Sequence, residues 1–515
     1  MTDDDRDPAS AALEADRRAL LRGALLAPLV CASPAMARAL GDPGPSASPL
    51  APGEALAIDA GQALLPAEEG RHHVRSDITL VVRDGQIEAV RTGAAKGVRT
   101  IDARGLLVLP GFISGHTHGC SATPTRGIIE GGRSFARPLE LVESLPAEQL
   151  DALTAYNVAE LLLSGATTHV EMSLSLRQAQ SYVRVARRWG VRCYPGGMVP
   201  GIARLFPIWF RQDDQVLFDS EADTLREIAD NLAFAESVNG VDDGRIRPQM
   251  TPHAADTQTP ATMAAFAAAA RKLGHGVHTH LSQSARETAT VRRLHGMTPT
   301  EWFQAHGMLA AGPFFGAHMV GLDLAVDAPL LREAGAVYAH CPSAGGAGGP
   351  TQPYPEALAA GLAVNIGIDT HSNDYVENLK LAVLYGQARH SLLAEHSAAK
   401  LQRPTIDDAV AGATRVAADG LRRPDLGRLA PGARADLVGI DVTSPLVGVG
   451  ARPPEPLHHL LYANGSAVRL VMTDGQLQVN GGRFLVDDLS RVVREGGRVV
   501  SELWARLGRE GWLTQ

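Results

Sequence analysis

The sequence predicts an α/β protein: a (β/α)8 TIM barrel with a small β-sandwich domain built from both ends of the chain. Three observations predict it: repeated helix-then-strand units in the middle, hairpin patterns near both ends, and polar side chains where predicted strands end. A doubly wound open sheet is the alternative. It is disfavoured because no GxGxxG or phosphate-binding loop follows the first strand of the central region.

Each predicted helix of the middle region is followed by a glycine and then by an apolar strand. The pairs are helix 150–163 with strand 166–172, 178–189 with 191–194, 261–273 with 277–281, 329–334 with 336–340, and 356–360 with 362–369. A glycine at a helix exit is typical of a left-handed C-cap, and alternating helices and strands favour a parallel sheet. The spacing of these units corresponds to about eight helix–strand units over about 300 residues, which favours a closed barrel. The active sites of such barrels lie at the carboxyl ends of the strands.

Two β-rich regions flank this middle region. Residues 77–90 read as strand, Asp-Gly turn and strand, and the same signals recur at 435–440 and 468–477. We therefore expect a composite β-sandwich domain from residues 53–110 and 430–485, inserted around a barrel at 111–429. A helical tail follows at 486–515. It is amphipathic, so we expect it to pack on the barrel or on a second subunit of a homo-oligomer.

The first 39 residues have the features of an export signal rather than of a folded domain. Arg17-Arg18 precedes a short apolar run at 24–31, and Ala-x-Ala sites follow. This pattern resembles a twin-arginine signal, which predicts a periplasmic or otherwise exported protein, with a linker at 40–52. The apolar run is too short to span a bilayer, so we expect no membrane anchor. A disordered Ala-rich extension of a cytoplasmic protein is the alternative.

Composition limits the classes of partner. The chain has 515 residues, 45% of them hydrophobic, and a formal net charge of −8. A chain of this kind is globular and can bury a large core. Because it has no basic footprint, we expect a small-molecule substrate and no nucleic-acid partner.

The most informative segment is 109–118, which reads LPGFISGHTH and ends with His116 and His118. Residues i and i+2 of a strand point to the same face, so both imidazoles aim at one point. Two converging imidazoles make half of a zinc-type site. His280 and Asp369 end two further predicted strands, which would bring four metal-capable side chains to one face of the barrel. A single buried histidine such as His278, considered alone, can equally be a core residue that binds no metal.

Five motifs in order resemble those of the metal-dependent amidohydrolase superfamily. They are LPGFISGHTH at 109–118, HTHLSQ at 278–283, AHMVGLD at 317–323, AHCPS at 339–343 and GIDTHSN at 367–373. Their order is similar to that in the branch of cytosine, guanine and S-adenosylhomocysteine deaminases and of triazine, thiocarbamate and phenylurea hydrolases. The resemblance implies that one divalent metal ion is bound by His116, His118, His280 and Asp369.

The same resemblance implies roles for further residues. His318 would lie beside the attacking water, where it hydrogen-bonds the oxyanion and helps the leaving group, while Asp369 takes the proton of the water. His253, in a Pro-His pair, is expected to contact the substrate, and we assign His340 and His371 to substrate binding too.

The positions of the lysines favour one metal ion over two. Binuclear members of the superfamily bridge their metals with a carboxylated lysine at the end of the fourth strand. Here no lysine lies between His118 and Lys272, and Lys272 falls in a predicted helix. Three imidazoles and one carboxylate suit zinc best, although iron, cobalt or manganese are also possible.

Gln283 departs from the deaminase pattern. The deaminases have a glutamate at this position, and it carries a proton to the ring nitrogen of the substrate. An amide forms hydrogen bonds but carries no proton at neutral pH. The sequence therefore favours hydrolysis of an amide, urea or carbamate C–N bond in a small, aromatic or heterocyclic molecule, with Gln283 orienting the carbonyl. The alternatives are an aminohydrolase that releases ammonia from an N-heterocycle and an inactive binding protein. An apolar segment at 205–210 is consistent with a lip over the pocket.

Overall fold

The computed structural model describes residues 51–67, 72–95, 97–211, 214–348, 352–396 and 401–512. The predicted export signal at 1–39 and nearly all of the predicted linker at 40–52 lie outside these residues. Within the described ranges, no helix is both long and apolar enough to cross a membrane.

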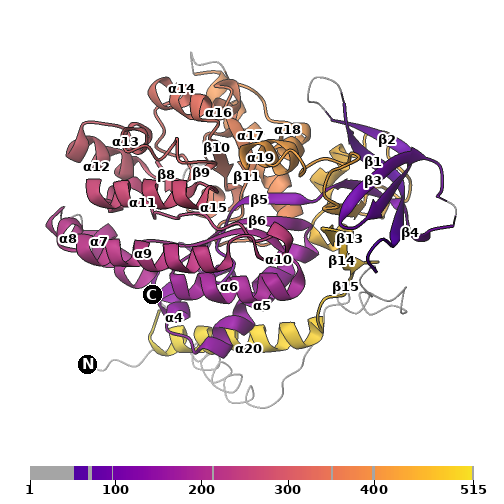
Figure 1. Ribbon diagram of the computed structural model, residues 1–515. Helices are drawn as coiled ribbons and strands as arrows, with labels where there is room; N and C mark the ends of the chain where they lie inside the picture. The colour runs from indigo at the N-terminus through magenta and orange to yellow at the C-terminus, as the bar shows by residue number, and fades with distance from the viewer. Residues whose placement is uncertain are drawn as a thin grey trace, which may run out of the picture. The chain divides into compact units, whose positions relative to one another are not determined.

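Seven strands of the central region form two parallel sheets (Figure 1). The first sheet has the order β5 (Phe112–Thr117), β6 (Ala166–Ser173) and β7 (Arg192–Gly197). The second has the order β11 (Ala363–Ile366), β10 (Val337–His340), β9 (Phe314–His318) and β8 (Val277–Leu281). Because helices separate consecutive strands, the α/β class predicted from the sequence is confirmed.

Residues 245–253 occupy the place between β7 and β8. The amide of Arg247 donates to the carbonyl of Cys193 at 2.9 Å, and the amide of His278 donates to the carbonyl of Met250 at 3.0 Å. Pro248 and Pro252 have no N–H to donate, and in the described chain this segment makes isolated bridges rather than a strand. A further isolated bridge joins Thr117 to Asp369, between the first and last parallel strands. Closure of the barrel therefore stays a prediction.

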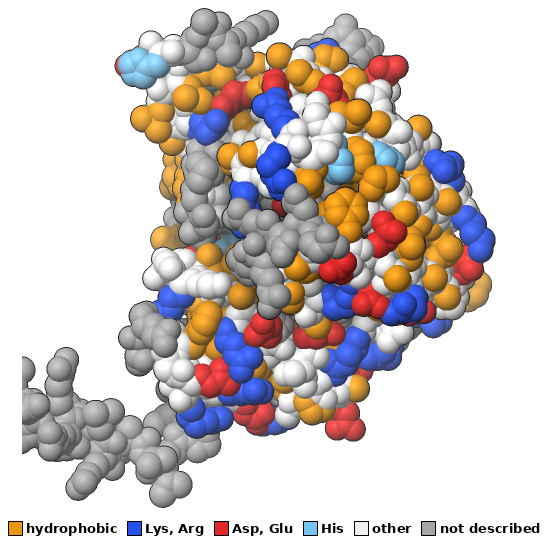
Figure 2. All heavy atoms as spheres, turned by 90° about the vertical axis from the view of Figure 1, so that its left-hand side faces the viewer, with side chains coloured by type: hydrophobic (Ala, Val, Ile, Leu, Met, Phe, Trp, Pro, Cys, Tyr) orange, Lys and Arg blue, Asp and Glu red, His pale blue; other side chains and the backbone are white. Residues whose placement is uncertain are grey.

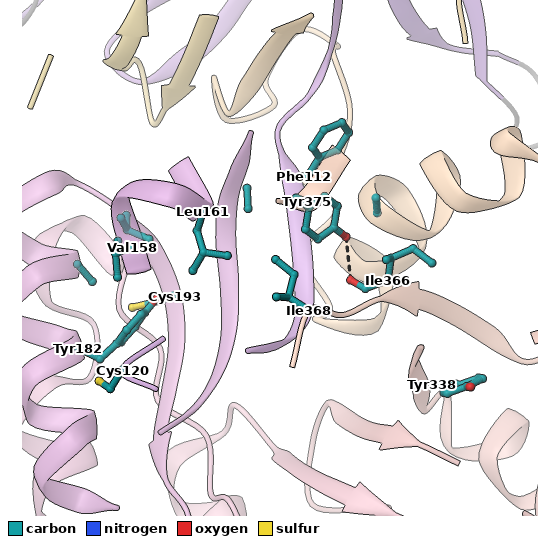
Figure 3. Close-up of a cluster of buried hydrophobic side chains, with 14 of the residues drawn as sticks. Phe112, Cys120, Val158, Leu161, Tyr182, Cys193, Tyr338, Ile366, Ile368 and Tyr375 are labelled. Atoms are coloured by element: carbon teal, nitrogen blue, oxygen red, sulfur yellow. Dashed lines mark hydrogen bonds between the residues drawn. The ribbon is translucent and has the colours of Figure 1, made fainter. Parts of the chain in front are cut away.

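One tyrosine also joins the first and last parallel strands. The hydroxyl of Tyr375 lies 2.8 Å from the carbonyl oxygen of Ile366 and 2.9 Å from that of Ile113, and its ring stacks on Phe112 at 5.2 Å between centroids (Figure 3). All four residues are buried in the core. This contact fixes β5, which carries the predicted metal ligand His116 and leads directly to His118, against β11.

The two ends of the chain form one eight-stranded sheet. Its order is β15-β14-β13-β12-β4-β1-β2-β3, with β4 (Arg99–Pro110) pairing parallel to β1 and antiparallel to β12. The other strands are β1 (Ala55–Pro66), β2 (His72–Arg83), β3 (Gln86–Thr92), β12 (Leu437–Asp441), β13 (Val468–Thr473), β14 (Gln476–Asn480) and β15 (Arg483–Phe484). Since hydrogen bonds join all eight strands in one sheet, the expected sandwich and its domain boundaries stay predictions.

Both predicted Asp-Gly turns are present in this sheet. Asp84 and Gly85 have φ values of 47° and 77°, and Asp474 and Gly475 have values of 53° and 78°. Positive φ at both central residues is the requirement of a two-residue hairpin turn, which is why Asp-Gly occurs there.

Helices surround the parallel strands (Figure 1). The predicted left-handed C-caps occur at Gly190, Gly274 and Gly335. The helices are α3 (Ala122–Thr125), α4 (Ala136–Glu143), α5 (Ala147–Leu163), α6 (Leu176–Trp189), α7 (Ile202–Arg211), α8 (Asp214–Asp219), α9 (Glu221–Val238), α10 (Val241–Gly244), α11 (Pro260–Leu273), α12 (Ala285–His295), α13 (Pro299–Ala305), α14 (Leu324–Ala334), α15 (Pro342–Gly348), α16 (Tyr354–Ala359), α17 (Tyr375–Ala394), α18 (Ile406–Ala411), α19 (Ala417–Gly420) and α20 (Leu489–Arg509), with short turns η2 (Ala255–Thr257), η3 (Gly412–Val416), η4 (His458–Tyr462) and η5 (Gly465–Ala467).

The last helix, α20, packs on α5 and on α4. Its buried residues include Val492, Val499, Leu503 and Leu507, as the amphipathic pattern predicts. The indole nitrogen of Trp504 donates to the carbonyl of Pro124 at 3.0 Å. The predicted tail thus packs against helices of the central region.

Charged side chains are mixed over the face that Figure 2 shows. Lys and Arg side chains alternate with Asp and Glu side chains, and no extended patch of one sign appears on the described part of this face. This distribution gives no support to a nucleic-acid partner on that face.

Candidate active site

Five polar side chains meet where the parallel strands end. The Nε2 atom of His118 lies 3.3 Å from Oδ1 of Asp369, and Nε2 of His116 lies 3.9 Å from the same oxygen. On the other side of the carboxylate, Nε2 of His318 lies 3.9 Å from Oδ2. Two groups of this cluster are close enough to hold a metal ion: His116 with His118 and Asp369, and His116 with His280 and His318.

The other ring nitrogens of the predicted ligands are engaged, and this fixes the tautomers. Nδ1 of His118 lies 2.5 Å from the carbonyl oxygen of Met172, and Nδ1 of His280 lies 2.8 Å from that of His253. A carbonyl oxygen only accepts, so each Nδ1 carries the hydrogen and each Nε2 keeps a lone pair. This second contact is typical of metal-ligating histidines.

His116 differs from these two because its Nδ1 faces another imidazole nitrogen, and either of the two nitrogens can be the donor. Its Nδ1 lies 2.7 Å from Nε2 of His278, whereas its Nε2 is buried and makes no hydrogen bond within the described residues. A buried nitrogen without a partner is costly unless something binds it. The three imidazoles and the carboxylate of Asp369 therefore fit a divalent metal ion.

The protonation states also fit. Burial lowers the pKa of His116 and of His280 well below the usual value. For Asp369 burial acts to raise the pKa, but the hydrogen bond with His118 and the charge of His318 hold it below its usual range. For His118 burial acts to lower the pKa, but the hydrogen bond with Asp369 raises it. A proton on the His118–Asp369 pair would thus compete with a metal ion for the same atoms.

Two of these residues have strained backbones. His318 and Asp369 have φ values of 75° and 64°, in the left-handed region that residues with a side chain rarely adopt. Such a conformation costs about 1–3 kcal/mol and persists only where the surrounding structure enforces it. Both strained residues face the same cluster, which is typical of a functional site.

A cavity of about 570 Å³ opens beside the cluster. Its polar side is formed by residues of the cluster and by Gln283, Ser284, Arg286, Gln352 and Thr370, and its other side is apolar. Among the described residues that line it, Asp369 is the one carboxylate.

The family of the chain follows from a comparison with family models. Residues 107–477 match the amidohydrolase family. The chain belongs to this family. It is an enzyme that acts on carbon–nitrogen bonds, as the resemblance of its motifs implied.

Curated relatives of this amidohydrolase include deaminases. A protein of Natronomonas pharaonis named 5-methylthioadenosine/S-adenosylhomocysteine deaminase is 31% identical over 462 residues, which cover 88% of this chain and 98% of the relative. A protein of the same name from Nitratidesulfovibrio vulgaris is 29% identical, with 87% and 98% coverage.

Solved structures share the fold of this amidohydrolase. An adenosine deaminase from Xanthomonas campestris with bound zinc superposes with a TM-score of 0.70 at 21% identity, covering 89% of this chain and all of the other. A triazine hydrolase from Arthrobacter aurescens gives a TM-score of 0.72 at 21% identity, with 87% and 99% coverage.

Most of the predicted site residues of the amidohydrolase come together. His118, His253, His280, Gln283, His318, Asp369 and His371 all line the cavity, and His116 lies against the rings of His118, His280 and His318. His340 is the exception. It is not among the described lining residues, and its ring stacks on Tyr354. The structure places the ring of His340 against Tyr354, and its role in substrate binding stays a prediction.

Gln352 links His340 to the site. Its Oε1 accepts a hydrogen bond of 2.8 Å from the amide of Cys341, which fixes the orientation of the side-chain amide. Its Nε2 consequently donates to Nδ1 of His318 at 3.2 Å. The hydrogen of neutral His318 is therefore on Nε2, the atom that faces Asp369 and the cavity. His318 is arranged as a hydrogen-bond donor at Nε2, unlike His118 and His280, whose Nε2 atoms keep a lone pair.

Sequence reasoning missed three supporting residues: His278, Glu171 and Gln352. His278 was interpreted as a core histidine, but it contacts the metal-ligand candidate His116. Glu171 on β6 is fully buried and accepts hydrogen bonds from the Thr117 hydroxyl at 2.7 Å and from the Gly119 amide at 3.0 Å. It thereby holds the turn that follows His118. A carboxylate inside an otherwise buried strand was the signal that could have identified it.

Proposed function

We propose that this amidohydrolase uses one divalent metal ion, most suitably zinc, to hydrolyse a carbon–nitrogen bond of a small aromatic or heterocyclic molecule. Two overlapping groups that share His116 carry the proposal: His116 with His118 and Asp369, and His116 with His280 and His318. Three nitrogens and one carboxylate suit zinc, whereas iron, cobalt and manganese also tolerate such a set. No lysine lines the described part of the cavity, which supports one ion. When bound, the ion supplies Lewis acidity that lowers the pKa of water towards neutrality.

The residues of the chain then move the protons. The Asp369 carboxylate, kept ionised by its neighbours, accepts the proton of the attacking water. His318 donates the hydrogen on its Nε2 to the negative charge that develops on the substrate and assists the leaving group. His253 and His371 line the cavity on either side and are proposed to orient the substrate.

For the leaving group we place ammonia first. The curated relatives are named as deaminases, and they support an aminohydrolase acting on an N-heterocycle better than they support hydrolysis of an amide, urea or carbamate. The alternative formulated from the sequence is therefore the better supported of the two.

Position 283 favours the second candidate, amide, urea or carbamate hydrolysis. The side-chain nitrogen of Gln283 is buried and makes no hydrogen bond within the described residues, so it has a hydrogen to donate to a carbonyl oxygen. An amide does not protonate a ring nitrogen, and apart from Asp369 no described lining residue is a carboxylate. Hydrolysis of a carbonyl substrate requires less proton transfer by residue 283 than deamination does.

The Gln283→Glu substitution separates the two candidates. The metal-loaded enzyme and the variant are supplied with amino-heterocycles, aryl amides, ureas and carbamates, while ammonia and substituted amines are measured separately. Deamination predicts ammonia from the wild type and about 10²- to 10⁴-fold faster release by the variant, at equal metal content. Amine without ammonia, and no gain in the variant, would support the second candidate. A fully metal-loaded enzyme that releases neither product would contradict the proposal.

Three further expectations belong to this proposal. The isolated bridges of residues 245–253 and of Thr117 with Asp369 support a closed (β/α)8 barrel as the frame of the site.

Export by the twin-arginine signal at 1–39 is tested by fractionating cells that carry the wild type or a double variant, Arg17→Lys with Arg18→Lys. Assembly into a homo-oligomer is tested by light scattering during gel filtration.

A further inference from the structure

One side of the cavity is formed by apolar side chains from two helices and the adjoining strand ends. We refer to this surface as the apolar wall. It consists of Phe135, Leu139, Leu174, Met198, Ile202 and Leu205. The same side chains belong to one hydrophobic cluster, which continues away from the cavity to Met172 and Phe206.

The local fold explains why the wall is apolar throughout. Helix α4 follows the loop after His118, helix α7 follows β7, and the two helices pack on each other. The backbone between them is also satisfied: the amide of Met198 donates to the carbonyl of Ser173 at 2.7 Å, and the amide of Ile202 donates to that of Leu174 at 2.8 Å. These peptide groups of the wall are thus already paired and do not need a polar ligand.

The cavity is therefore divided chemically. Its polar lining consists of the cluster of histidines with Asp369, Gln283, Ser284, Arg286, Gln352 and Thr370, and its apolar lining includes the apolar wall. A substrate that fills this space has a polar reacting end and an apolar group attached to it. A sugar ring in the second position would bury hydroxyl groups against side chains that neither donate nor accept hydrogen bonds.

We propose that the apolar wall is a specificity site that binds an aryl or alkyl substituent of the substrate and rejects a ribose. This inference rests on the proposed function and names its substrate class. It sets the chain apart from its curated relatives, since both substrates in their name are adenosine derivatives and carry a ribose. The substrate is then an N-heterocycle or an acyl compound with an apolar substituent.

A matched pair of probes tests this inference: adenosine and 9-cyclopentyladenine, which share the amino-heterocycle and differ in the polarity of a five-membered ring. Binding to the metal-loaded enzyme is measured by calorimetry. We expect the cyclopentyl compound to bind roughly 10- to 100-fold more tightly. The ratio of the two affinities, cyclopentyl compound over adenosine, should fall in the Leu205→Asn variant. It should also fall in the Phe135→Asn variant, whose substitution is at a half-buried position. Leu392→Asn is the control, because Leu392 is 73% exposed on α17 and lies outside the cavity.

Equal or tighter binding of adenosine overturns the inference, as does the failure of both probes to bind or an unchanged ratio in both wall variants. Turnover is recorded separately. A binding preference for the cyclopentyl compound without any product from the substrate panel would leave the wall assigned and overturn the proposed reaction. Product formation together with tighter binding of adenosine would support the proposed reaction and overturn the assignment of the apolar wall.

Discussion

The guanidinium group of Arg192 donates two hydrogen bonds, of 2.7 and 3.1 Å, to the two carboxylate oxygens of Asp436, which lies 244 residues later in the chain. Arg192 belongs to β7 of the parallel sheet, and Asp436 directly precedes β12 of the eight-stranded sheet. Asp474 lies 3.1 Å from the same guanidinium, and all three side chains are at most 5% exposed. This buried ion cluster connects the sheet made from the chain ends to the strands that carry the site.

Arg192→Met should destabilise the protein by about 3–5 kcal/mol, because it leaves the carboxylate of Asp436 buried without its cation and removes one of the cations beside Asp474. The free energy of unfolding in urea measures the effect. Arg184→Met is the matched control: Arg184 pairs with Asp151 at the surface, where an ion pair contributes about 1 kcal/mol or less. Equal losses in the two variants would contradict the structural role of the cluster.

His278→Leu should weaken metal binding by about 10- to 100-fold, because His116 loses the group that holds its Nδ1. The affinity is measured by competition with a chelator of known strength. His169→Leu provides the comparison, since His169 is equally buried but bonds to Tyr182, away from the site. If both variants lose metal affinity to the same extent, the effect is one of general stability.

Gln352→Leu should lower kcat by about 10- to 100-fold without changing metal content, because the hydrogen of His318 is then no longer confined to Nε2. Gln352→Glu should not rescue the activity, since a carboxylate accepts a hydrogen bond from Nδ1 and draws the hydrogen away from the cavity. Wild-type turnover by either variant would show that the tautomer of His318 does not matter for the reaction.

Removal of the metal should abolish activity and lower the melting temperature, because the buried imidazoles and the Asp369 carboxylate lose their common partner. Dialysis against a chelator followed by readdition of zinc, cobalt or manganese tests this, with activity and thermal unfolding recorded for each state. His280→Ala should reproduce the metal-free state and resist rescue. Full activity in the metal-free enzyme would refute the assignment of the site.

Asp256→Asn should change how stability depends on pH. Burial raises the pKa of Asp256 from 3.8 to about 6, with the charge of Arg286 acting in the opposite direction. The folded protein therefore holds this proton more tightly than the unfolded chain, so the wild type loses stability as the pH rises from about 4 to 6. The variant does not ionise there. The free energies of unfolding of the two proteins, measured from pH 4 to 7, should diverge in favour of the variant, and parallel curves would be the contrary result.

The sequence was sufficient for the features that depend on local patterns. Gly190 and Gly274 end helices as predicted, and His116, His118 and His280 occur at strand ends because strand periodicity and topology place them there. Contacts between distant segments were not predictable in this way. The hydrogen bond of 3.1 Å between His340 and Gln352 is an example, because the sequence pattern does not indicate it.

The irregular segment at 245–253 shows a second limit. Its prolines remove the alternation that identifies a strand, yet its peptide groups pair with both neighbouring strands. Hydrogen bonding by the surrounding structure, rather than local propensity, determines its course. The hydrogen-bond partners of Glu171 were likewise not predictable, because Thr117 at the end of β5 and Gly119 just after it belong to a distant segment of the chain.

The pairing of β4 between β1 and β12 has a consequence for the order of events during synthesis. β4 ends at Pro110 and is followed by β5, which carries His116 and is followed directly by His118. These two predicted ligands are thus attached to a strand whose second neighbour is made only after residue 436. Asp369 likewise emerges long after the first two histidines. During synthesis the two histidines therefore leave the ribosome before Asp369 and before the strand that completes the pairing of β4.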